Sequence, residues 1–153
     1  MMRLGYTEEA AAFAEFIQRR AHEPEGDNGP LNVMYGIDGR HGLNEETLDH
    51  LEGYCGSRPV RVGNAAFGHL QLDMYGELLD SLYLYDKYGT PVSYEMWTVI
   101  TFLLDWMARN WEHPDQSIWE VRGGRRQFTY SKLQCWVAFR SRIEAGNKAL
   151  SAS

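Results

Sequence analysis

Hydrophobic residues recur every three or four positions along four stretches of the chain, a spacing typical of amphipathic helices. Capping residues and helix breakers mark the ends of these stretches. The predicted helices run from a cap at Thr7 to near Pro24–Gly29, from about Ala65 to Lys87, from a cap at Ser93 to a break at His113–Pro114–Asp115, and from about Thr129 to Ala145. No stretch shows the alternation of a strand worth defending, so the sequence predicts an all-α protein.

The same spacing predicts which side chains face the core. These are Phe13, Phe16 and Ile17 in the first helix, Leu72, Tyr75, Leu79 and Leu82 beside Leu70, Met74 and Leu78 in the second, Trp97, Ile100, Leu103 or Leu104, Met107 and Trp111 in the third, and Leu133, Trp136 and Val137 in the last. The two stripes of the second helix make an apolar surface wide enough to need neighbours on more than one side.

Residues 29–61, between the first two helices, are rich in glycine and contain Pro30 and Pro59. They predict one short helix, capped by Asn44 and closed by Gly53, which brings the expected number of helices to about five. A loop-rich stretch of this length in a compact protein is often functional, because packing of the core does not require it.

Composition and charge narrow the classes of function. Hydrophobic residues make up 44% and charged residues 24% of the 153, which fits one globular domain. The net charge is −6 and the densest basic cluster, Arg122–Arg126, is short, so no nucleic-acid partner is expected. No apolar run reaches membrane-spanning length and the first residues lack a signal-peptide pattern, so we expect no membrane partner and a cytoplasmic protein with Cys55 and Cys135 reduced. The histidines show no metal-ligand spacing, and neither metal nor cofactor is expected.

The sharpest chemical signal is the segment Ser117–Gly124, in which Trp119 precedes Glu120 on a loop between two helices. Burial beside Trp119 would raise the pKa of Glu120 and keep it protonated, as a general acid for glycoside cleavage requires. Alternatively, Trp119 belongs to the core and Glu120 is a solvated residue paired with Arg122. The spacing alone leaves both interpretations open.

A second signal is the segment Tyr54–Asn64, which carries Arg58 and Arg61 just before the second predicted helix. Two guanidinium groups there would grip sugar hydroxyls or order a neighbouring carboxylate. The alternative is that they form supporting ion pairs with Glu52 or with a carboxylate on a loop.

A third signal lies in Leu31–Arg40, where Tyr35 offers a ring for stacking on a sugar and Asp38 a carboxylate for its hydroxyls. The alternative is a glycine-containing turn that Asp38 caps.

Three further carboxylates, Asp73, Glu77 and Asp80, lie on one face of the second predicted helix. They resemble an acidic site, but a solvated or inter-helix polar stripe is the interpretation that the spacing favours.

Taken together and in this order, the segments resemble glycoside hydrolase family 15, the glucoamylases and bacterial trehalase-like enzymes. The resemblance runs from about Leu4 to Phe139 and rests on Leu31–Gly39, Leu48–Asn64, Gln71–Asp80, and Ile118–Glu120 with Phe128–Thr129 downstream. It implies an (α/α)6 barrel with its active-site loops at one end, and inverting attack on the α-glucosidic bond of a non-reducing glucose. The implied substrate is an α-glucoside, trehalose or a maltooligosaccharide.

The resemblance also assigns roles. Glu120 matches the general acid, Trp119 the aromatic residue before it, and Arg58 the arginine of the Arg-Pro segment at the sugar site. Fungal glucoamylases place a Glu where this chain has Val121 and a Trp where it has Gly56, so stacking on the aglycone side is expected to differ, with Tyr54 as a substitute. The trehalase-like branch is the better fit.

The family's general base lies C-terminal to the acid, and no Glu in this chain matches it. Inversion needs a second carboxylate roughly 6.5–9.5 Å from the acid. We therefore expect a fragment that is inactive alone, completed by a missing C-terminal segment or self-associating through an exposed apolar patch of more than about 400 Å². Were the chain active alone, Asp38, Glu52 and Glu77 would be the candidates for the base. The competing interpretations are a non-catalytic carbohydrate-binding module and a helical interaction module.

Overall fold

The computed structural model describes residues 5–23, 28–120 and 123–151, with side chains described as far as residue 141. Its elements, in chain order, are α1 (Thr7–Ala21), β1 (Glu46–Thr47), the 3-10 turn η2 (Tyr54–Gly56), β2 (Arg61–Val62), the 3-10 turn η3 (Ala65–Gly68), α2 (Leu72–Tyr88), α3 (Tyr94–Asn110) and α4 (Thr129–Ser151). The predicted all-α class is confirmed, with four α-helices in the described residues rather than about five. None of these helices is both long and apolar enough to cross a membrane.

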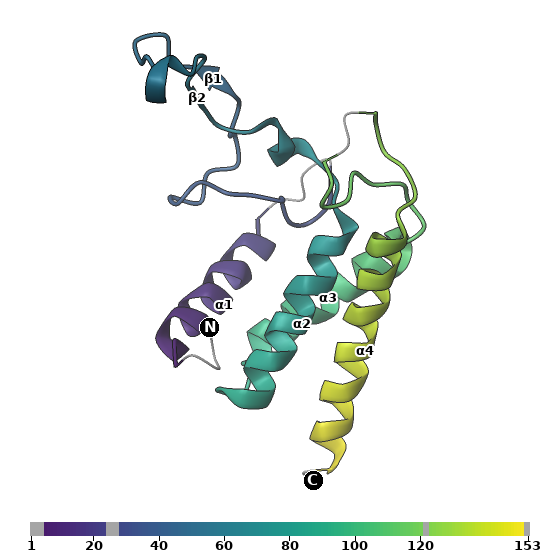
Figure 1. Ribbon diagram of the computed structural model, residues 1–153. Helices are drawn as coiled ribbons and strands as arrows, with labels where there is room; N and C mark the ends of the chain where they lie inside the picture. Colours follow the sequence, from purple (N-terminus) through teal and green to yellow (C-terminus); the bar gives the residue numbers. More distant parts are fainter. Residues whose placement is uncertain (1–4, 24–27, 121–122, 152–153) are drawn as a thin grey trace.

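The two long connections of the chain lie at the same end of the helices (Figure 1). The segment between α1 and α2 forms an arm that projects from this end, and the segment between α3 and α4 folds over the start of α2. The short connection between α2 and α3 lies at the opposite end. Residues from distant parts of the sequence are therefore brought together at the start of α2.

The prediction of a short helix between Asn44 and Gly53 is wrong. In its place β1 and β2 pair antiparallel, with Glu46 opposite Val62. Backbone hydrogen bonds from Leu48 to Val60 (2.8 Å) and from Asn64 to Leu43 (2.8 Å) extend the pairing on both sides. Pairing between distant residues thus satisfies the backbone groups that the local capping signal would have placed in a helix.

The helix predicted from Ala65 begins later, at Leu72. Asn64 caps the turn η3 by accepting a hydrogen bond from the Ala66 amide (2.9 Å), and His69 and Gln71 are extended. The backbone between η3 and α2 bonds instead to the α3–α4 connection, which is why helical spacing in the sequence does not continue as a helix.

Most of the other helix boundaries are close to their predicted places, but α4 ends at Ser151 instead of about Ala145. Ser93 caps α3 as predicted, accepting from the Met96 amide (3.1 Å), and α4 begins at Thr129. The N-cap of α1 is Tyr6 instead of Thr7, and α1 ends at Ala21. Pro24, near which its end was predicted, lies outside the described residues.

The core forms around α2 and α3, where the predicted stripes are largely confirmed. Buried side chains include Leu70, Leu72, Tyr75, Leu78, Leu79, Leu82, Ile100, Leu103, Leu104 and Met107. Tyr75 stacks on Trp106 with ring centroids 5.0 Å apart, and its hydroxyl lies 3.4 Å from both the amide nitrogen and the carbonyl oxygen of Leu31. The start of the arm is thereby fastened to the core.

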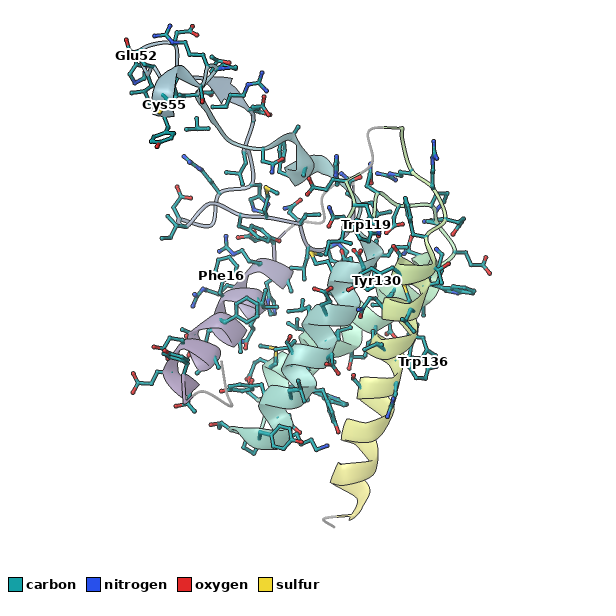
Figure 2. All side chains as sticks on the ribbon, in the orientation of Figure 1. Phe16, Glu52, Cys55, Trp119, Tyr130 and Trp136 are labelled. Carbon is teal, nitrogen blue, oxygen red and sulfur yellow. The ribbon has the colours of Figure 1, made fainter. Side chains whose placement is uncertain are left out.

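The prediction that Leu133 and Trp136 of α4 face the core is wrong. Leu133 and Trp136 are 52% and 56% exposed, and Trp136 points away from the other helices (Figure 2). The buried face consists of small side chains instead, namely Ser131, Cys135, Ala138 and Ser141. Small side chains let α4 approach α2 closely, so the bulky residues turn outward. Trp111 and Phe13, also predicted inward, are 44% and 42% exposed.

Neither cysteine forms a disulfide, as predicted. Burial raises the pKa of the Cys135 thiol to about 11, so this thiol stays protonated at neutral pH and acts as a small apolar side chain. Self-association through an exposed apolar patch stays a prediction.

The helices α2 and α4 lie in close contact at Gly76, where an added Cβ would lie 2.3 Å from the carbonyl oxygen of Gln134. We expect Gly76→Ala to lower the free energy of unfolding by about 1–3 kcal/mol, because backbone of α4 must move to make room. Urea denaturation followed by circular dichroism measures this change. Gly42→Ala is the matched control, since its Cβ would meet nothing within 4 Å. Equal stability of the two variants would contradict the close packing.

Candidate active site

The candidate active site is the α3–α4 connection, which carries Trp119 and Glu120 and lies over the start of α2. Leu70 and Gln116 hold the two segments together. The Leu70 amide donates to Gln116 Oε1 (3.0 Å) and the Gln116 amide donates to the Leu70 carbonyl (2.9 Å). Asn28 adds a third segment, donating to the Gly68 carbonyl (2.7 Å) and accepting from Arg125.

Asp115 anchors the beginning of this connection. Its side chain is fully buried, and Oδ2 accepts hydrogen bonds from the Leu72 amide (2.9 Å) and the Ser131 hydroxyl (2.7 Å). Asp115 therefore caps the N-terminus of α2 from a distant loop, where the helix dipole favours a carboxylate. Its backbone also pairs with Arg126 in both directions (2.9 and 2.8 Å), which closes the loop on itself.

Asp73, in the first turn of α2, anchors the loop next to Glu120. Its Oδ2 accepts from the Ser117 hydroxyl (3.0 Å) and from the Ile118 amide (2.7 Å), while Oδ1 accepts from the Met74 amide (3.0 Å). Burial raises the pKa of this carboxyl, the hydrogen bonds oppose the rise, and repulsion from Asp115 adds to it. The net effect is a carboxyl that is harder to ionise than a free one.

Neither of the two interpretations holds for Trp119: Glu120 is not buried beside it, and Trp119 does not belong to the core. Trp119 is 71% exposed, and Glu120 and Ile118 are exposed as well. The loop is fastened through the polar residues before them, with Ser117 fully buried, and the three residues that follow are left exposed. The proposed pairing with Arg122 lies outside the described residues.

The arm carries the predicted sugar-binding residues Arg58, Arg61 and Tyr54. Arg61 forms an ion pair with Glu45 across the hairpin (2.7 Å), which is the supporting role that the sequence left open. Arg58 is exposed, before a cis peptide bond to Pro59, and Tyr54 is 89% exposed. In Figure 2 the tip of the arm, marked by Glu52 and Cys55, lies away from Trp119. The structure thus does not bring the arm residues together with Trp119.

Tyr35 and Asp38 have local partners. The Tyr35 hydroxyl accepts from the Asn32 amide (2.9 Å), and its ring lies edge-on to Phe16 and His41, at 5.6 and 5.4 Å. Burial raises the pKa of Tyr35. Asp38 accepts from the Arg40 amide (3.2 Å), so it caps a turn, as one of the two interpretations held. Contact of either residue with a sugar stays a prediction.

The polar stripe on α2 is an inter-helix one, as the spacing favoured. Besides Asp73, Glu77 accepts from the Tyr130 hydroxyl (2.6 Å) and Asp80 from the Ser141 hydroxyl (3.1 Å), both on α4.

Sequence reasoning missed the anchoring roles of Asp115, Ser117 and Ser131. The one available signal was an Asp directly after the helix-breaking His113–Pro114, a position suited to hydrogen-bond a nearby backbone. In the part of the chain that the structure describes, no three His, Cys, Asp or Glu side chains are grouped to hold a metal ion.

The class of protein follows from comparison with known proteins. The family model "Glycosyl hydrolases family 15" matches residues 1–149. Trehalase from Mycolicibacterium smegmatis is 44% identical over 145 residues, covering 95% of this chain and 21% of the relative. Trehalase from Mycobacterium tuberculosis is 42% identical, covering 88% of this chain and 20% of the relative. Trehalase 1 from Sulfolobus acidocaldarius is also 42% identical, covering 74% of this chain and 21% of the relative.

The chain belongs to glycosyl hydrolase family 15. It spans about a fifth of the length of these curated relatives. No solved structure matches it significantly.

Removal of the Asp115 carboxylate tests whether it holds the loop and α2 together. Asp115→Ala leaves the buried Leu72 amide and Ser131 hydroxyl without their acceptor, so we expect a loss of about 2–4 kcal/mol in the free energy of unfolding. Chemical denaturation measures it, with exposed Asp49→Ala as a control that should stay within about 0.5 kcal/mol of the unchanged chain. A loss no larger than that of the control would refute the anchoring role.

The raised pKa of Asp73 predicts how stability depends on pH. The folded state holds this proton more tightly than the unfolded state, in which the pKa of the carboxyl is near its ordinary value of 3.8. Ionisation therefore costs stability as the pH rises through the raised pKa. The stability of the unchanged chain minus that of Asp73→Asn should therefore decrease from about pH 4 upward and then level off. Denaturation curves of both proteins over this range give the difference, and an increase with pH would contradict the assignment.

Proposed function

We propose that this chain is the general-acid segment of an inverting α-glucoside hydrolase, and that trehalose is its substrate. The observation that carries the proposal is the Trp119–Glu120 pair, held exposed at the loop end of the helices by two buried aspartates. The trehalase relatives support the substrate class. The resemblance of Ile118–Glu120 and Phe128–Thr129 to the family's acid motif supports the role of Glu120.

In this mechanism the Glu120 carboxyl donates its proton to the glycosidic oxygen as the bond to the anomeric carbon breaks. A water attacks that carbon from the opposite face, activated by a second carboxylate roughly 6.5–9.5 Å away. The exposed ring of Trp119 provides an apolar surface for a sugar face. A contact of Arg58 with the sugar hydroxyls stays a prediction of the family resemblance, because the arm that carries Arg58 lies away from Trp119 (Figure 2).

We infer that the second carboxylate comes from outside this sequence. Glu77 is engaged by Tyr130, and Asp38 caps its own turn. Glu52 lies at the tip of the arm, away from Trp119 (Figure 2). We also propose that the four helices are part of an (α/α)6 barrel, whose further helices would cover the exposed residues of α4 and complete the site.

Glucose release tests the function of the chain alone. We expect no release from trehalose or from a maltooligosaccharide series, because the base is missing. Release that Glu120→Gln abolishes and exposed Glu9→Gln preserves would overturn the claim that the base lies elsewhere. Glu52→Gln and Glu77→Gln would then identify the base.

The proposal is tested in full by transferring this chain into the trehalase from Mycolicibacterium smegmatis, in place of the 145 residues it matches. We expect the chimeric enzyme to hydrolyse trehalose, and Glu120→Gln to lower its kcat about 10²–10⁴-fold, the usual contribution of a general acid. Glu9→Gln serves as the control. An active chimera that tolerates Glu120→Gln would refute the assignment of the acid.

A non-catalytic sugar-binding module is the second candidate, favoured by the exposed rings of Trp119 and Tyr54. Calorimetric titration of the chain with trehalose distinguishes the two. Saturable binding that Trp119→Ala abolishes but Glu120→Gln leaves unchanged, together with an inactive chimera, would support the binding module.

A further inference from the structure

The turn that presents Glu120 has a backbone that needs outside support. Ser117 and Glu120 both have positive φ, 52° and 46°, which side chains with a Cβ rarely adopt without compensating contacts. One backbone hydrogen bond, from the Glu120 amide to the Ser117 carbonyl (3.2 Å), closes the turn. The rest of its support comes from α2.

The two oxygens of the Asp73 carboxyl divide their work between helix and loop. Oδ1 accepts from the Met74 amide of the helix, which orients the carboxyl, and Oδ2 then accepts from the Ser117 hydroxyl and the Ile118 amide. Asp73 is only 2% exposed, so water does not compete for these bonds. Asp73 therefore holds the turn against the start of α2 through Ser117 and Ile118, the two residues directly before Trp119 and Glu120.

We infer that Asp73 is a positioning residue, which fixes the direction of the Glu120 side chain by holding the turn 117–120 against the start of α2. It touches neither substrate nor the reacting atoms, and it acts through Ser117 and Ile118. The inference rests on the proposed function for the catalytic role of Glu120, while the anchoring itself is measurable without activity.

The test uses hydrogen exchange and pH titration by NMR on the uniformly labelled 153-residue chain. In Asp73→Ala we expect the Ile118 amide to exchange about tenfold faster or more, since it loses a hydrogen bond to a carboxylate, while the core amide of Leu103 is unchanged. Asp80→Ala is the matched control, because it removes another carboxylate of α2 that bonds to α4, away from the turn. It should leave Ile118 protected.

A spectroscopic signature separates positioning from general stability. In the unchanged chain the chemical shift of the Ile118 amide proton should titrate with the Asp73 carboxyl, with a midpoint above 3.8. This titration should persist in Asp80→Ala and vanish in Asp73→Asn, a variant of nearly the same size that keeps the fold if Asp73→Ala does not. The Glu120 cross-peak should shift in both Asp73 variants.

The outcomes are distinct. Protection of Ile118 and an unmoved Glu120 cross-peak in the Asp73 variants would overturn the inference, as would an Ile118 amide that does not titrate in the unchanged chain. Loss of both signals in the Asp73 variants but not in Asp80→Ala supports it. The proposed function fails separately, through a chimeric trehalase that tolerates Glu120→Gln.

Discussion

The N-terminus of α2 is the constraint around which the candidate site is organised. The first amides of a helix have no partner within it, and those of α2 are buried, so acceptors must come from elsewhere. Asp115 supplies one from the α3–α4 connection, and Asp73 turns a carboxyl back onto the same connection. The hydrogen bonds that join the start of α2 to the α3–α4 connection therefore serve two purposes: they cap the helix and they fix the conformation of the loop.

The same helix sets the packing on its other face. Gly76 and the small residues of α4 allow the two backbones to approach closely, and the carboxylates of α2 bond to hydroxyls on α4 across this contact. Close contact leaves no room for Leu133 or Trp136, which turn outward. The apolar surface of the four helices is consequently larger than they cover themselves, which fits a family whose curated relatives are about five times longer.

The sequence predicted well those features that depend on residues close to one another along the chain. The stripes around Leu72, Tyr75 and Leu103 and the cap at Ser93 are properties of single helices, and they appear in the structure. Non-local pairing decided the rest. The outer part of the arm is a hairpin because residues 60–64 bond to residues 43–48. The small residues of α4 face α2 because the two helix backbones lie in close contact at Gly76. The motif around Glu120 was recognisable, but its exposure depends on hydrogen bonds of Asp115 with Leu72 and of Ser117 with Asp73, each between residues more than forty positions apart.

The exposure of Trp119 and Glu120 has a mechanistic consequence. A general acid works in a site that excludes water, where a carboxyl keeps its proton and electrostatic interactions are strong. The α3–α4 connection leaves Glu120 facing solvent. Under the proposed function, the surface that covers it therefore comes from the bound sugar and from the segment that carries the base. A neighbouring carboxylate also makes a carboxyl harder to ionise. Under the proposed function, the two halves of the inverting site thus depend on each other: this chain supplies the position of the acid, and the other half supplies its surroundings.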